Sequence, residues 1–173
     1  MEPPPPEVTL RPFDLSDVDD LMAWASDPRV TRFSRRGPVA TREAALRHLQ
    51  HGLLRRPWCR AICLGGRPVG SVSVAPGAHR CRASLGYRVA HAHWGKGVAT
   101  AAVRRAAAEV FEEMPHLERL EAVADVDNPA SQRVLEKAGF QREALLRKYF
   151  LLHGVARDVV MYSLVVPDDL VGR

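Results

Sequence analysis

The feature that most constrains this sequence is a glycine-containing turn between a strand-like segment and a long helical segment. Apolar side chains alternate over residues 81–89, a period typical of a half-buried strand. Over residues 97–113 they recur every three or four positions, which is typical of an amphipathic helix. The period changes across a short turn at residues 94–100. The sequence therefore predicts a mixed α/β fold built around a strand, a turn and a helix.

The remaining segments extend this unit to one domain, because a length of 173 residues suits a single core. We expect a mixed central β-sheet flanked by helices, in the order β-α-α-β-β-β-α-β-α-β-β. The predicted strands are residues 8–13, 59–64, 69–75, 81–89, 120–124, 140–152 and 155–165. The predicted helices are residues 16–27, 41–50, 97–113 and 128–138.

The two ends of the chain differ from the predicted domain. We expect residues 1–7 to be a disordered proline-rich leader, residues 8–166 to form the domain, and residues 167–173 to form a C-terminal tail. The first residues lack the basic and apolar regions of a signal peptide. No apolar run reaches the roughly 18 residues of a membrane-spanning helix. The sequence thus predicts a cytoplasmic protein, small enough for nuclear entry, with no membrane partner.

The positive charge of the chain does not indicate nucleic-acid binding. Lys and Arg number 25 against 20 Asp and Glu, so the net charge is +5. The arginines are scattered along the sequence, and aromatic residues make up only 6%. A nucleic-acid-binding protein usually gathers basic residues on one face. We favour a solvated basic surface, with a field that attracts a small anionic molecule as the functional alternative.

The cysteines do not form a recognisable metal site. Cys59, Cys63 and Cys81 form no Cys-x-x-Cys pair, and no matching pair of histidines completes a set of ligands. We expect free buried thiols and no metal.

The turn at residues 94–100 has two readings. Glycines let a backbone approach a ligand closely, and the N–H groups of a helix N-terminus favour an anion, so the turn could cradle a diphosphate. The alternative is a plain tight turn. The spacing of a Walker loop is absent, and Thr100 stands where the third glycine of a dinucleotide fingerprint would be.

A second segment, Asp127–Ser131, begins the predicted helix at residues 128–138. Asp127 or Asn128 could simply cap that helix. Alternatively, Asn128 and Ser131 lie one helical turn apart and face the same ligand.

Taken together, these segments resemble the GCN5-related N-acetyltransferase (GNAT) superfamily. The likeness lies in the Gly86-Tyr87 strand end, the Gly-Lys-Gly-Val-Ala-Thr turn, the Asn-Pro-Ala-Ser helix start and the Glu-Lys-Ala-Gly-Phe ending. It covers about residues 8–166 and is closest to the RimJ/RimL-like branch, including its plant homologues. The resemblance implies that residues 8–166 form an N-acetyltransferase domain with the GNAT fold and that acetyl-CoA is the co-substrate.

The resemblance also implies where acetyl-CoA binds. The amides of Gly95–Thr100 would hold its diphosphate, although Trp94 stands at a position where the family has Gln or Arg. The backbone near Tyr87–Val89 would pair with the pantetheine arm and polarise the thioester, and Asn128 would bind the arm further along. The implied acetyl-CoA-binding residues are Tyr87, Val89, Trp94, Gly95, Lys96, Gly97, Val98, Ala99, Thr100, Asn128 and Ser131.

For catalysis, the resemblance implies roles for Ser131 and Asn128. Leu135 stands at the position of the Tyr that protonates the leaving thiolate in many members, so Ser131 is the substitute, as in the RimL-like branch. The base of that branch is a Glu, but the matching position here is Phe150. Other candidate bases, only weakly motivated, are Glu143, His153, His91 and His93.

We therefore expect transfer of an acetyl group to a primary amine, on a protein N-terminus or a small molecule. The missing Glu and Tyr motivate an alternative: a catalytically weak or inactive domain that binds acyl-CoA or a protein. The predicted acceptor wall, formed by Trp24, Phe33, Arg35, Tyr149 and Phe150, would suit an apolar or acidic acceptor and repel a polyamine. A homodimer is left open.

Overall fold

A mixed β-sheet organises the computed structural model, which describes residues 6–167. Its strand order is β1-β2-β3-β4-β5-β7-β6, and every neighbouring pair is antiparallel except β4 and β5. The strands are β1 (Thr9–Arg11), β2 (Trp58–Leu64), β3 (Arg67–Pro76), β4 (Arg82–Val89), β5 (Arg119–Asp125), β6 (Gln141–Leu152) and β7 (Val155–Val165). This architecture confirms the predicted fold class.

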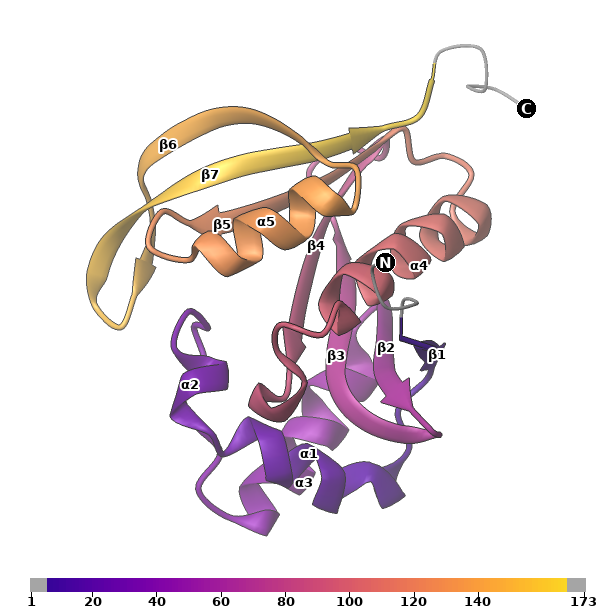
Figure 1. The fold of residues 1–173 in the computed structure, drawn as a ribbon, viewed down its shortest axis with the longest axis vertical. Helices are drawn as coiled ribbons and strands as arrows, with labels where there is room; N and C mark the ends of the chain where they lie inside the picture. Colours follow the sequence, from indigo (N-terminus) through magenta and orange to yellow (C-terminus); the bar gives the residue numbers. More distant parts are fainter. Residues whose placement is uncertain (1–5, 168–173) are drawn as a thin grey trace.

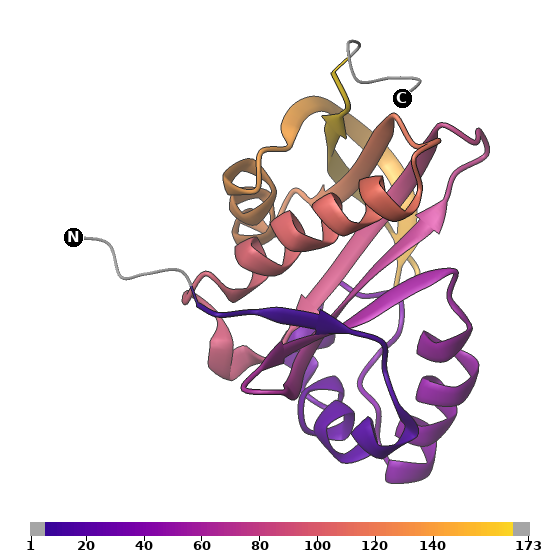
Figure 2. The same ribbon diagram turned by 90° about the vertical axis from the view of Figure 1, so that its right-hand side faces the viewer.

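Two groups of helices cover the sheet (Figures 1 and 2). Helices α4 and α5 lie on one side, and α1 and α3 lie against the other. The helices are α1 (Val18–Ala25), α2 (Pro28–Thr31), α3 (Arg42–His51), α4 (Val98–Glu113) and α5 (Pro129–Lys137), with short 3-10 turns at η1 (Leu15–Asp17), η2 (Leu53–Arg55) and η3 (His91–His93). Within residues 6–167, no helix combines the length and hydropathy needed to span a membrane.

Strand β2 divides the interior into two cores. Trp58 and Ile62 pack with the apolar stripe of α4, whereas Cys59, Ala61 and Cys63 pack with α1 and α3. A strand buried on both faces reads as a nearly continuous apolar run, and β2 does so.

The structure departs from the predicted elements at several boundaries. The first strand ends at Arg11 because Pro12 cannot donate to a ladder. Pro28 follows the first helix, as predicted, but it also starts the short helix α2. The Asp27 side chain caps α2. Cys81 is exposed, unlike the other two thiols. The predicted leader at residues 1–7 and tail at residues 167–173 lie largely outside the described residues.

The parallel pair at the centre of the sheet stays together only briefly. Pairing of β4 with β5 is limited to Arg82, Ala83 and Ser84 against residues 119–121. Beyond these positions the two strands diverge, so Leu85–Val89 and Ala122–Asp125 no longer contact each other as a ladder. The free edges of both strands therefore face an opening inside the sheet.

The close approach of β3 to β4 at this opening requires a glycine. Gly70 pairs with Val89, and a Cβ built on Gly70 would lie 2.2 Å from the Arg88 carbonyl oxygen. No real Cβ comes so close to backbone, so any side chain at residue 70 must push the end of β4 away.

We predict that Gly70→Ala lowers the free energy of unfolding by about 1–3 kcal/mol, the usual cost of overpacking. Chemical denaturation monitored by circular dichroism measures this change. The matched control is Gly86→Ala on β4, because a Cβ there meets no atom within 4 Å. An equal loss of stability in both variants would contradict the close approach as the cause.

Candidate active site

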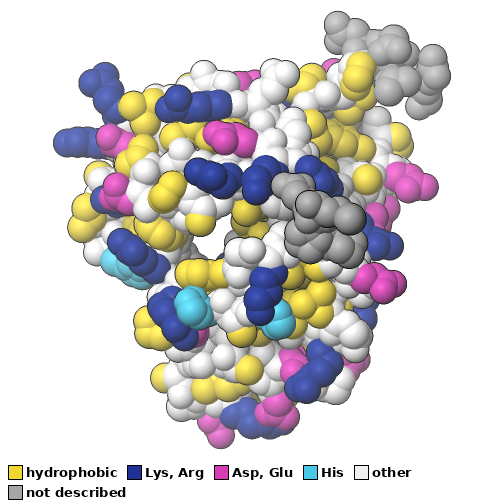
Figure 3. Space-filling view, viewed as in Figure 1, with side chains coloured by type: hydrophobic (Ala, Val, Ile, Leu, Met, Phe, Trp, Pro, Cys, Tyr) yellow, Lys and Arg dark blue, Asp and Glu magenta, His cyan; other side chains and the backbone are white. Residues whose placement is uncertain are grey.

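A large cavity occupies the opening between the diverging strands. Its volume is about 1340 Å³, above the roughly 300–1,000 Å³ of a typical small-ligand pocket. Figure 3 shows the opening near the middle of the molecule. Its walls come from β4, β5, the starts of α4 and α5, the segment at residues 29–36 and the bulge in β6. The cavity is therefore large enough to hold two small molecules together.

The edge of β4 presents backbone groups to this cavity. Ala90 N donates to Val69 O across β3 at 2.7 Å. Because hydrogen bonding alternates along an antiparallel pair, Tyr87 and Val89 direct their N–H and C=O groups away from β3, toward the opening. Trp94 Nε1 donates to the Val89 carbonyl oxygen at 2.7 Å. The N–H of Val89 is thus left as a donor at the edge.

The N-terminus of α4 forms a second set of donors. Gly95 and Gly97 adopt φ of 69° and 76°, a region that disfavours other residues. Gly97 precedes α4, and no side chain of the described residues caps this helix. The first helical bond runs from Ala101 N to Gly97 O. The N–H groups of Val98–Thr100 therefore have no helical partner and lie at the cavity wall, an arrangement that fits a diphosphate.

The predicted turn residues do not all face the cavity. Trp94, Gly95, Gly97, Val98, Ala99 and Thr100 line it. Lys96 does not: its Nζ donates to the Ala92 carbonyl at 2.8 Å, so its side chain folds back on the turn. Trp94 stands at the family's Gln or Arg position, where its indole fixes the end of β4.

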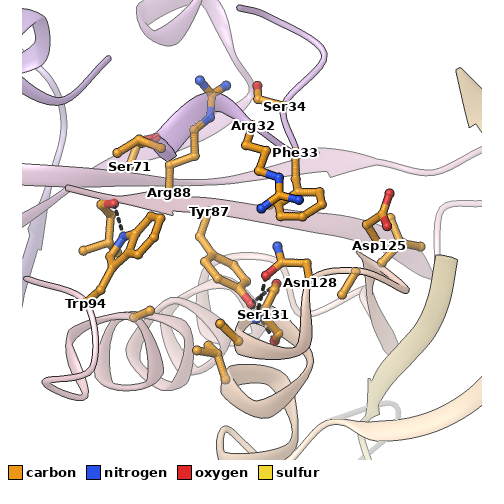
Figure 4. Close-up of a pocket in the computed structure, with 18 of the residues that line it drawn as sticks. Arg32, Phe33, Ser34, Ser71, Tyr87, Arg88, Trp94, Asp125, Asn128 and Ser131 are labelled. Carbon is orange, nitrogen blue, oxygen red and sulfur yellow. Dashed lines mark hydrogen bonds between the residues drawn. The ribbon is translucent and has the colours of Figure 1, made fainter. Parts of the chain in front are cut away.

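The start of α5 brings three predicted residues together (Figure 4). The Tyr87 hydroxyl lies 2.7 Å from Ser131 Oγ and donates to the Ser131 carbonyl at 3.1 Å. Asn128 Oδ1 accepts from Ser131 N at 3.2 Å, so Asn128 is the helix cap as well as a cavity residue. Burial raises the pKa of Tyr87 to about 12, so its hydroxyl stays protonated near neutral pH.

An ion-pair cluster that sequence reasoning missed supports this arrangement. Arg157 on β7 donates to both carboxylate oxygens of Asp125, at 2.8 and 2.7 Å, and also pairs with Asp127. Asp125 ends β5, and Asp127 lies just before the cap of α5. Arg157 therefore ties the diverging strand to the helix that carries Ser131. These charges meet because β7 pairs with β5 in the sheet, although the two strands are not consecutive in the sequence.

Most of the candidate bases lie outside the cavity. Glu143 is bound by Arg119 at 2.8 and 2.6 Å, which holds its pKa down at about 2. His153 lies in the β6–β7 turn, and the His91 ring packs at a tilt of 59° against that of Trp94, with ring centroids 4.7 Å apart. Of the four candidates, His93 lines the wall.

Four of the five residues of the predicted acceptor wall line the cavity. Phe33, Arg35, Tyr149 and Phe150 line the cavity, the last two because β6 bulges between Leu146 and Phe150. Trp24 is instead 4% exposed in the core beside α3.

Two positions show how the site departs from the family's pattern. Phe150, at the position of the Glu, lines the wall with an apolar ring. Leu135, at the position of the Tyr, is 0% exposed in the core and cannot reach a ligand. The described residues contain no cluster of His, Cys, Asp and Glu suited to a metal ion.

Comparison with known proteins identifies the family. Residues 7–141 match the acetyltransferase (GNAT) domain family, so the chain belongs to it. YoaA of Bacillus subtilis, named an uncharacterized N-acetyltransferase, is 39% identical over 92% of this chain and 94% of its own. The [ribosomal protein uS5]-alanine N-acetyltransferase of Escherichia coli is 33% identical over 55% of this chain and 47% of its own.

A solved structure supports the same assignment. RimJ of Mycobacterium smegmatis, in complex with CoA-disulfide, is 26% identical with a TM-score of 0.74, and the match covers 96% of this chain and 84% of that one. The chain is thus an acetyl-CoA-dependent N-acetyltransferase whose relatives include the RimJ/RimL-like branch.

We predict that Arg157→Met lowers the free energy of unfolding at pH 7 by about 3 kcal/mol, because it leaves the buried Asp125 carboxylate unpaired. Arg157 depresses the pKa of Asp125 in the folded state. The stability that this pair contributes is therefore present above the unfolded pKa of about 4 and is lost as the pH falls through the folded value. The difference between wild type and variant should shrink below about pH 4.

Urea titrations at pH 7 and at pH 3 measure these differences. The control is Arg142→Met, an exposed arginine on the neighbouring strand β6. A deficit in Arg157→Met that is the same at both pH values would contradict the charge explanation.

Proposed function

We propose that the chain acetylates a free α-amino group, on a peptide or protein N-terminus or on a small molecule. The observation that carries this proposal is the acceptor side of the cavity, which combines basic side chains with no uncommitted carboxylate among the described residues. The relative from Escherichia coli reported above is named for N-acetylation of an alanine of ribosomal protein uS5, which supports an α-amino acceptor.

The donor side fits acetyl-CoA through backbone groups. The N–H groups of Val98–Thr100, at the uncapped start of α4 on the cavity wall, would bind the diphosphate of acetyl-CoA. The pantetheine arm hydrogen-bonds along the free edge of β4, as an added strand does at the edge of a sheet. The N–H of Val89 then supplies a fixed donor for the charge that develops on the acetyl oxygen.

Transfer requires that one proton leave the amine and another reach the sulfur. The amine nitrogen bonds to the acetyl carbon as the carbon–sulfur bond breaks, the amine releases its proton to solvent water, and CoA leaves as a thiol. In this proposal Ser131 donates its proton to the sulfur and takes one from the Tyr87 hydroxyl at 2.7 Å, which is protonated near neutral pH and recovers its own proton from water.

The described acceptor wall has no free carboxylate that could deprotonate the acceptor. We therefore expect the protein to favour amines that are already partly neutral at pH 7. Asp125 and Asp127 are both engaged by Arg157, and Phe150 replaces the family's Glu. An α-amine, with a pKa of about 7.7–8.0, is about one-tenth neutral at pH 7, whereas a lysine amine with a pKa of about 10.4 is neutral in fewer than about one molecule in a thousand. Neighbouring arginines lower an ammonium pKa further.

A direct assay tests the function. Purified protein should release CoA thiol from acetyl-CoA in the presence of N-terminal peptides or α-amines, and far more slowly with spermidine or with N-terminally blocked lysine peptides. Calorimetric CoA binding without turnover of any of these amines would instead favour the inactive, acyl-CoA-binding alternative. Efficient spermidine acetylation would contradict the proposed acceptor class.

We predict that Ser131→Ala lowers kcat by about 100-fold, a typical loss for a general acid. The Kd for CoA should change by less than about threefold, since the donor cradle is backbone and remains intact. Stopped-time thiol assays and calorimetry measure the two quantities. Ser84→Ala, an exposed serine on β4, is the control. An unchanged kcat would remove Ser131 from the mechanism.

We further predict that kcat/KM rises with pH along one limb whose midpoint follows the acceptor's own amine pKa. No protein base is required, and Tyr87 with a pKa of about 12 adds no falling limb below pH 10. Profiles measured with acceptors of different amine pKa distinguish the cases. A midpoint that stays fixed across acceptors would reveal a protein base.

A further inference from the structure

A polar patch interrupts the apolar face of the sheet beneath α1 and α3. On that face β2 contributes Cys59 and Ala61 to the core, and their partners on β3 are Ser73 and Ser71. Ser71 is only 5% exposed and lines the cavity. Polar side chains on an inward sheet face are costly unless they find polar partners, so this patch is suited to a polar ligand rather than to core packing.

Arg88 extends the patch onto β4. It is directly opposite Ser71 in the register and projects from the face opposite Tyr87, as Figure 4 shows. Arg88 is half-buried and lines the cavity, yet within residues 6–167 it makes no hydrogen bond or ion pair to another side chain. Buried arginines are normally paired. The guanidinium of the half-buried Arg88 therefore has no side-chain partner among the described residues and is available to a ligand.

The neighbours of Arg88 add positive charge rather than compensate for it. Burial, then Arg56 and Arg36, lower the pKa of Arg88, and the one group that opposes them is the Cys59 thiol. Burial and the same three arginines hold the pKa of the nearby His48 down at about 4, so this imidazole is neutral. The surroundings of Arg88 thus combine three guanidinium groups with no carboxylate.

The carboxylates elsewhere on the cavity wall are already committed. Asp125 and Asp127 bind Arg157 on the other side of the opening between β4 and β5. Arg56 Nη1 donates to Ser73 Oγ at 2.8 Å, which holds its guanidinium over the patch. The space beside Arg88 is open because Gly86, the partner of Ser73, has no side chain and no atom within 4 Å of a built Cβ.

We propose that Arg88, with Arg36, Arg56 and the hydroxyl of Ser71, binds a carboxylate of the acceptor, so that the substrate is an acidic amine. This inference rests on the proposed function. Guanidinium groups match a carboxylate with two parallel hydrogen bonds. The carboxylate lies on one face of β4 while the amine meets the acetyl group at the edge, near Val89. The carboxylate can belong to a free amino acid or to an acidic side chain in a peptide.

Two matched acceptor pairs distinguish these sources. The first pair is alanine and alaninamide; the second is the peptide amide Ala-Asp-Ala and its Ala-Asn-Ala counterpart. Because the α-amine of free alanine is more basic than that of alaninamide, kcat/KM is expressed per neutral amine. On this basis we expect wild type to favour the acidic member of one pair by at least about tenfold, as charge-assisted hydrogen bonds provide. Preference in the first pair identifies an amino acid, and preference in the second identifies an acidic peptide.

Variants locate the effect. Arg88→Met should lower kcat/KM for the acidic member far more than for the neutral member, so that the preference is lost, and Arg56→Gln should reduce the preference in part. Arg55→Gln, a change at the exposed neighbour outside the cavity wall, should leave it intact. Circular dichroism confirms that each variant folds. Equal kcat/KM for both members of both pairs, or a preference that persists in Arg88→Met, would overturn the proposal.

A binding measurement separates this proposal from the proposed function. If wild type acetylates none of the four acceptors, the proposed function fails. Calorimetry with CoA-saturated protein then decides on the subsite alone. N-acetyl-Ala-Asp-Ala amide should bind and its Asn counterpart should not, with the difference lost in Arg88→Met. Equal affinity of the two peptides, or no binding of either, would overturn the subsite.

Discussion

The short parallel contact between β4 and β5 is the constraint on which the site depends. Three positions hold the strands together, and the remaining residues of each strand separate. A sheet that stayed paired would consume the N–H groups of Tyr87 and Val89 and leave no cavity. Separation has to be stabilised elsewhere, and the structure supplies this through Gly70, which lets β3 hold the end of β4, and Arg157, which holds the end of β5.

The two sides of the opening attract anions in different ways. On the donor side, the positive charge is the partial charge of helix α4 and its unpaired N–H groups. On the acceptor side, it comes from side chains on β4 and on the segments at residues 29–36 and 56, while the carboxylates near the opening are held by Arg157. Part of the positive charge behind the net value of +5 is therefore concentrated in arginines that line one cavity.

Much of the fold could be predicted from the sequence because it depends on local patterns. The change of period around residues 94–100 correctly predicted strand β4 and helix α4, and Asn128-Pro129 correctly predicted the start of α5. The resemblance to GNAT proteins singled out Tyr87 and Val89, which line the cavity at the free edge of β4. The Asp125–Arg157 pair could not be predicted, because it joins strands that are neighbours only in the finished sheet. Nor could the folding back of Lys96 or the burial of Trp24, since both depend on tertiary contacts.

The most direct test of this account is residue-resolved amide hydrogen exchange with and without CoA. If CoA lies along the free edge of β4 and on the start of α4, the amides of Tyr87, Val89 and Val98–Thr100 should become protected. The amides of Gly86 and Arg88, which face β3, should be protected already and change little. Bound CoA that protects a different segment, and leaves Val89 and Val98–Thr100 exchanging as before, would contradict the account.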